Sequence, residues 1–154
     1  MTLYFAYGSN MARAPMARRC PTAQPHGPAA LHGWRFVITT DRYASIVPAP
    51  GGVVHGVLWR LAPRDLAALN AYESLDSGLY RRARLGVRIR GRVARALVYV
   101  GRERAEGRPA PGYVETVVAA GRDWRLPQRY LAELARWAPS GYRAARAVEV
   151  GELA

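Results

Sequence analysis

Short runs of β-type residues, each closed by glycine, proline or another turn residue, recur along most of the chain and constrain its fold more than any other feature. Leu85, Val87 and Ile89 alternate with a glycine and two arginines, and a period of two puts each set of side chains on its own face of a strand. We expect these arginines on a solvated sheet face. Similar patterns predict strands at residues 3–7, 31–40, 44–47, 53–61, 80–89 and 93–100, with a loop at 21–28 and a turn at 48–52.

Helical patterns lie between and after these strands. Pro63 and Pro127 each stand at the start of an apolar repeat with helical spacing, a position that suits proline because its missing N–H is not needed there. Asn10 is a suitable N-cap for a further helix. The expected helices cover residues 11–19, 63–74 and 113–120, with a last one from 127 onward. The mixed order predicts an α+β fold with a small, largely antiparallel sheet that can close on itself.

The composition fits one compact domain spanning residues 1–154. Half of the 154 residues are apolar, enough for a core without covalent staples. The single cysteine, Cys20, excludes an intrachain disulfide and is expected to be a small packing residue in a reducing cytoplasm. Residues 1–5 lack the basic and apolar regions of a signal peptide. No apolar run approaches the roughly 20 residues that span a bilayer. We expect a cytoplasmic protein without membrane association.

The chain is strongly basic, with a formal net charge of +12 carried by arginine alone. Such a charge is typical of proteins that bind nucleic acid or another acidic partner. Arginine in place of lysine, together with abundant alanine, glycine and proline, is also typical of GC-rich coding. We favour the second interpretation because the arginines are scattered, so nucleic acid is not the expected partner. A cationic field would still attract a small acidic substrate.

A glycine stands where the first strand gives way to a helix, in the segment Tyr7-Gly8-Ser9-Asn10. Without a Cβ, the backbone at Gly8 can approach a ligand closely. Unpaired N–H groups at a helix start favour negative charge, so this turn can hold a carboxylate, a phosphate or a developing oxyanion. A plain glycine turn followed by an asparagine cap explains the same four residues.

Two other kinds of chemistry lack support. Ser9 does not sit in the G-x-S-x-G pattern of a hydrolase nucleophile, because Gly8 adjoins it directly. The histidines, His26, His32 and His55, show neither a base arrangement nor metal-ligand spacing. We therefore expect no serine nucleophile and no metal.

Glu73 is the candidate general base. It falls at the end of the helix that Pro63 opens, where the helix dipole disfavours a negative charge, and its neighbours are apolar or aromatic. Desolvation there would raise the pKa of its carboxyl group. A surface glutamate paired with a nearby arginine is the alternative. Asp65 is expected on the helix surface and Asp76 in a turn.

The opening segment 4–11 resembles the first motif of the γ-glutamylcyclotransferase superfamily, which includes the AIG2-like proteins. Four further segments resemble later elements of that family in the same order: 44–48 with 54–59, 69–80, 109–113 and 126–131. The resemblance implies a small mixed β-barrel with flanking helices. It also implies an enzyme in which the α-amine of a γ-glutamyl amino acid or amine attacks its own γ-carbonyl, forming 5-oxoproline and releasing the other amine without a cofactor.

The resemblance also implies roles for single residues. Glu73 falls at the family's general base, and the γ-glutamyl group would bind against Tyr7, Gly8, Ser9 and Asn10. Tyr113 would contact the substrate, and Tyr80 would orient Glu73 or line the cavity. The leaving amine stays open, as does the choice between a monomer and a homodimer. The alternative is a protein that keeps the pocket without turnover and binds a small molecule, nucleic acid or an acidic partner.

Overall fold

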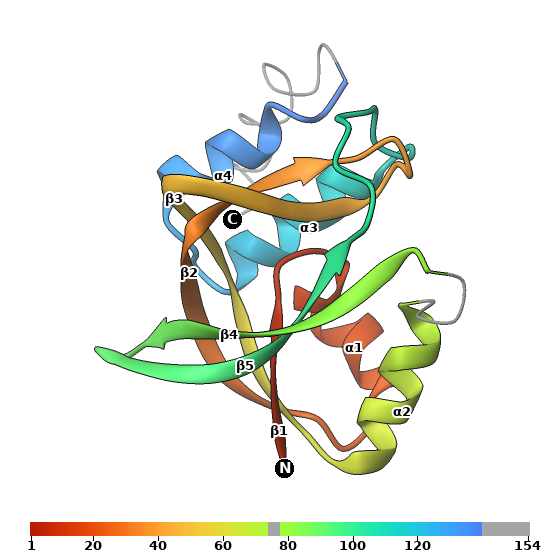
Figure 1. Cartoon of the computed structure of the whole chain (residues 1–154), viewed down its shortest axis with the longest axis vertical. Helices are drawn as coiled ribbons and strands as arrows, with labels where there is room; N and C mark the ends of the chain where they lie inside the picture. Colours follow the sequence, from red (N-terminus) through yellow and green to blue (C-terminus); the bar gives the residue numbers. More distant parts are fainter. Residues whose placement is uncertain (74–77, 140–154) are drawn as a thin grey trace.

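The chain forms a closed five-stranded barrel in a computed structural model that describes residues 1–73 and 78–139 (Figure 1). Around the barrel the strands follow the order β1-β3-β2-β4-β5. Every pairing is antiparallel except the one between β1 and β5, where Tyr4 lies opposite Leu97. The bounds of the strands are β1 Thr2–Ala6, β2 Gln24–Ile38, β3 Ala44–Leu61, β4 Tyr80–Ile89 and β5 Arg92–Gly101. The predicted α+β class and the largely antiparallel, closed sheet are therefore confirmed.

Within the described residues, four α-helices flank the barrel at positions close to the predicted ones. In Figure 1, α1 and α2 lie together at the lower right, whereas α3 and α4 lie together in the upper half. Their bounds are α1 Arg13–Arg19, α2 Pro63–Tyr72, α3 Tyr113–Asp123 and α4 Gln128–Ala135, and a short 3-10 helix, η1, covers Ser9–Met11. No helix in the described part of the chain has the length and apolar character needed to cross a membrane.

The barrel interior supplies the core that holds β1 in place. Phe5 in β1, Leu58 in β3 and Val98 in β5 are fully buried. β1 lies between β3 and β5, so the segment that follows it is anchored on both sides. At the far end of that segment, the indole Nε1 of Trp124 donates a 2.7 Å hydrogen bond to the carbonyl of Met11. The turn after β1 is therefore fixed at its beginning and at its end.

Two predicted interruptions are absent because bulges take their place. The loop predicted at residues 21–28 belongs largely to β2, which pairs with β3 from Gln24 onward. The pairing register shifts between Pro25 and Gly27, and this bulge accommodates prolines that cannot donate to a ladder. The turn predicted at 48–52 lies inside β3, opposite a second register shift between His32 and Trp34.

Two polar residues have structural roles that differ from the predicted ones. Asp65 is buried rather than on a helix surface. Its carboxylate accepts hydrogen bonds from the Ala62 N–H at 3.1 Å and from the Thr22 hydroxyl at 2.5 Å, which ties the start of α2 to the segment after α1. Asn10 lies inside η1 and does not cap α1, whose N-cap is Ala12. The predicted helix end at Ser74 and the turn at Asp76 lie outside the described residues.

Candidate active site

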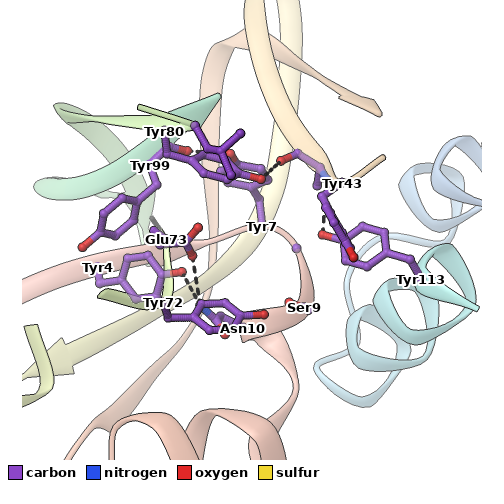
Figure 2. A pocket seen from close by; sticks show the side chains of 13 residues that line it. Tyr4, Tyr7, Ser9, Asn10, Tyr43, Tyr72, Glu73, Tyr80, Tyr99 and Tyr113 are labelled. Atoms are coloured by element: carbon purple, nitrogen blue, oxygen red, sulfur yellow. Dashed lines mark hydrogen bonds between the residues drawn. The ribbon is translucent and has the colours of Figure 1, made fainter. Parts of the chain in front are cut away.

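A cavity of about 260 Å³ opens beside the turn after β1 (Figure 2). The cavity is surrounded by residues from β1, η1, the end of α2, the starts of β3 and β4, β5 and α3. They are Tyr4, Tyr7, Gly8, Ser9, Asn10, Tyr43, Ala44, Tyr72, Glu73, Leu79, Tyr80, Tyr99 and Tyr113. Every residue assigned to the site in the sequence lines this one cavity, although Glu73 and Asn10 are separated by more than sixty positions.

Tyrosine dominates the lining: seven of the nine tyrosines in the chain are in it. Three of them use their O–H groups to fix the walls. Tyr7 donates to the Tyr99 carbonyl at 2.5 Å, Tyr80 donates to the Ala44 carbonyl at 2.9 Å, and Tyr99 donates to Asn70 Oδ1 at 2.5 Å. A buried phenol needs such a partner, and these hydrogen bonds hold the rings in single orientations. Tyr80 therefore lines the cavity and bonds to β3, and it makes no hydrogen bond to Glu73 among the described residues.

The Glu73 carboxyl group is the one charged side chain among the described lining residues. The Glu73 N–H donates to the Leu69 carbonyl at 2.9 Å, so the residue continues from the end of α2. Burial raises the pKa of Glu73 to about 7, and the nearby Arg19 guanidinium opposes that shift. Desolvation outweighs the favourable charge, as expected for a carboxylate that faces aromatic rings. Near neutral pH this group can both accept and release a proton.

The Asn10 amide connects Glu73 to Tyr4 and Arg19. Its Nδ2 donates to Tyr4 Oη at 3.0 Å and to Glu73 Oε1 at 3.3 Å, while its Oδ1 accepts from the Arg19 guanidinium. A guanidinium only donates, so this contact determines which side of the amide is oxygen and leaves the NH₂ group facing the carboxylate. Arg19 also stacks on Tyr72, with its guanidinium carbon 3.8 Å from the ring centroid. Arg19 thus orients Asn10 without itself lining the cavity.

Gly8 brings the backbone close to Tyr113. A Cβ at Gly8 would lie 2.8 Å from Tyr113 Oη, nearer than such atoms approach, so a larger residue here would push the Tyr113 hydroxyl away from the turn. The Tyr113 hydroxyl accepts a hydrogen bond from the Ala44 N–H at 3.3 Å. The N–H groups of Gly8 and Asn10 have no hydrogen-bond partner within 1–73 and 78–139. A bound oxygen atom can therefore accept from this turn.

Four tyrosines and two aliphatic residues of the lining were not assigned from the sequence: Tyr4, Tyr43, Tyr72, Tyr99, Ala44 and Leu79. The composition contained one signal for these tyrosines, because the chain has nine tyrosines and only two phenylalanines. Aromatic residues serve a core equally well without a hydroxyl, so this excess indicates rings that need a polar tip.

The fold and the site define an enzyme: a barrel with a small cavity, one carboxyl group that titrates near neutrality and a turn whose Gly8 and Asn10 N–H groups have no partner among the described residues. The family described as gamma-glutamyl cyclotransferase, AIG2-like, matches residues 4–126, and the chain belongs to that family. Membership makes it an enzyme that cyclises a γ-glutamyl group.

Individual relatives agree with this assignment. The gamma-glutamylcyclotransferase of Mus musculus is 28% identical over 152 residues, which cover 92% of this chain and 81% of the relative. The gamma-glutamylcyclotransferase of Homo sapiens is 25% identical over 162 residues, covering 98% and 86%. A solved structure of a gamma-glutamyl cyclotransferase superposes with a TM-score of 0.84 at 23% identity, covering 99% of both chains. That last likeness supports the fold.

Proposed function

We propose that the protein converts a γ-glutamyl amino acid or amine to 5-oxoproline, with Glu73 as the general base. The substrate's α-nitrogen attacks its own γ-carbonyl carbon, a ring C–N bond forms, and the bond to the leaving amine breaks. The α-ammonium group loses two protons on the way to the ring N–H of the product. Glu73 accepts them one after the other and passes each to the departing nitrogen, which leaves as an ammonium group, so Glu73 ends each cycle deprotonated. The released amine and 5-oxoproline together contain all the atoms of the substrate.

The observation that carries this proposal is the single cavity that contains both the Glu73 carboxyl group and the Tyr7–Asn10 turn. A base alone does not cyclise an extended chain, which must be held with its amine near its γ-carbonyl. A cavity of about 260 Å³ is small enough to impose that folded conformation. Because nucleophile and electrophile belong to one molecule, holding the near-attack conformation supplies much of the rate.

The turn has a separate task in this mechanism. The tetrahedral intermediate carries an oxyanion, and the substrate also carries an α-carboxylate. The free N–H groups of Gly8 and Asn10 can donate to either anion. The Tyr113 hydroxyl accepts from the Ala44 N–H and has no acceptor among the described residues, so it can donate to a ligand oxygen. In this scheme Ser9 is part of the binding turn Tyr7–Asn10 and forms no covalent bond to the substrate.

The direct test is 5-oxoproline release by the purified protein from a panel of γ-glutamyl amino acids and γ-glutamylamines, followed by chromatography. We expect catalytic release from at least one class, with the amine appearing in equal amount. α-Glutamyl dipeptides with the same leaving groups are the matched control, because they cannot form the five-membered ring by this route. Absence of 5-oxoproline from every γ-glutamyl compound would contradict the proposed activity.

The pH dependence of kcat/KM gives a second test. With a Glu73 pKa of about 7, the active carboxylate is lost as the pH falls, so kcat/KM should decline below about pH 7. Arg19→Met removes the charge that lowers this pKa. The acid limb, which is the low-pH side of the kcat/KM profile, should therefore move to higher pH. Each whole pH unit of that move lowers kcat/KM on the limb about tenfold.

Arg18→Met is the matched control for this experiment, because Arg18 is the neighbouring exposed arginine on α1. It removes the same overall charge without touching Asn10, so the limb should stay in place. An identical limb in wild type and Arg19→Met, measured at equal ionic strength, would argue against the Arg19–Asn10–Glu73 connection.

A further inference from the structure

Exposed apolar side chains gather at the mouth of the active-site cavity. Five large apolar side chains are exposed in the described part of the chain: Met1, Tyr43, Tyr72, Leu79 and Val93. Three of these, Tyr43, Tyr72 and Leu79, line the cavity, with 49%, 45% and 41% of their surfaces accessible. They come from three separate segments, so no single sequence run accounts for the cluster. Apolar groups concentrated around an opening indicate a binding surface.

The two aromatic side chains at the mouth are held in place by their neighbours. The Tyr43 ring meets the Tyr113 ring edge-on (Figure 2), with centroids 5.1 Å apart, and the Arg19 guanidinium stacks on the Tyr72 ring. Leu79 is fixed through its backbone, whose carbonyl accepts from the Arg102 N–H at 3.0 Å. Ordering the rings before a ligand arrives lowers the entropy cost of binding.

The cavity size is consistent with a leaving group that lies at this mouth. A volume of about 260 Å³ corresponds to about nine water molecules, comparable to the nine or so non-hydrogen atoms of a γ-glutamyl group. Glu73 and the Tyr7–Asn10 turn lie in this space. If the γ-glutamyl group is held against Glu73 and that turn, the substituent of the leaving amine would project toward the most exposed lining residues, Tyr43, Tyr72 and Leu79.

No cation is among the described lining residues of the mouth, and the Arg19 guanidinium beside Tyr72 is already engaged with that ring and with Asn10 Oδ1. Glu73 is the one charged side chain in the described lining, and the three mouth residues are uncharged. A charged or amide side chain on the leaving amine would lose water there without gaining an ion pair. An aliphatic or aromatic side chain would bury apolar area instead.

We propose that Tyr43, Tyr72 and Leu79 form a leaving-group subsite that selects γ-glutamyl substrates whose amine carries a bulky apolar or aromatic side chain. This inference rests on the proposed cyclisation. Its test compares γ-glutamyl-phenylalanine and γ-glutamyl-leucine with γ-glutamyl-alanine and γ-glutamyl-asparagine, all four of which share the same backbone and carboxylates. We expect kcat/KM for the first two to exceed that for the last two by about tenfold or more.

A pair of variants assigns this preference to the mouth. Leu79→Gln keeps a side chain of similar size while adding polarity, and it should lower the phenylalanine-to-alanine ratio of kcat/KM about threefold or more. Val93→Gln makes the same kind of change at an exposed apolar residue outside the cavity and should leave the ratio unchanged. Thermal melting of both variants checks that each is folded.

The outcomes separate this inference from the proposed activity. Release of 5-oxoproline at equal kcat/KM from all four substrates leaves the activity intact and overturns the subsite. An unchanged ratio in Leu79→Gln overturns it as well. If no substrate is cyclised, the proposed activity fails, and calorimetric binding then decides the subsite: equal affinity of wild type for γ-glutamyl-phenylalanine and γ-glutamyl-alanine overturns it, and tighter binding of the former supports it.

Discussion

Glu73→Gln is expected to lower 5-oxoproline release by about a hundredfold to ten-thousandfold, the range that general-base catalysis contributes. Glutamine has nearly the shape of glutamate, but its amide cannot take a proton from the substrate's α-ammonium group. Its oxygen can still accept the hydrogen bond from Asn10 Nδ2. Substrate binding and folding should therefore survive while turnover is lost.

The measurement is the initial rate of 5-oxoproline formation, with a thermal melt to establish that the variant is folded. Glu133→Gln is the matched control, since Glu133 is an exposed glutamate on α4 outside the cavity. It should retain the wild-type rate. Near wild-type turnover in Glu73→Gln would remove Glu73 from the mechanism.

Gly56→Ala is expected to be the most destabilising small substitution in the barrel. A Cβ at Gly56 in β3 would lie 2.3 Å from the Ala6 carbonyl oxygen and 2.9 Å from the Phe5 ring. The first neighbour is backbone, so β1 and β3 must separate just before the Tyr7–Asn10 turn. We expect a loss of about 3 kcal/mol in the free energy of unfolding, which corresponds to a Tm lower by roughly 6–12 °C.

Gly86→Ala provides the comparison, measured in the same denaturation experiment. Its added Cβ would meet Val93 Cγ1 at 3.0 Å, and Val93 is an exposed side chain that can move away. A change within about 0.5 kcal/mol is expected for such a surface position. Equal stabilities of the two variants would contradict the close approach of β1 and β3 at Gly56.

Much of the barrel was predictable because alternation and turn residues report local conformation. β4 matches its predicted bounds at residues 80–89, where side chains alternate with little interruption. β2 and β3 are longer than predicted, because proline and glycine are the same residues that mark both loops and bulges. Whether a loop or a bulge forms depends on whether a partner strand lies alongside. That partner strand is distant in the sequence.

Some of the candidate site residues could likewise be predicted from local sequence, whereas others could not. Glu73 and the Tyr7–Asn10 turn could be chosen from local composition together with the family resemblance. The roles of Asn10 and Arg19 could not, because Asn10 also suits a helix cap and Arg19 is one of many arginines. Only the packing of η1 against the end of α2 brings the Asn10 amide within 3.3 Å of the Glu73 carboxylate.

The residue pattern alone determined the order of strands and helices, the family and the two segments proposed to carry the chemistry, since periodicity, turn residues and motifs act over a few neighbouring positions. Closure of the barrel decided the rest. It brought seven tyrosines around one cavity, buried the Glu73 carboxyl group enough to raise its pKa to about 7, and gathered Tyr43, Tyr72 and Leu79 at the mouth. Desolvation and long-range contacts exist only once distant segments meet, so they follow from the tertiary structure.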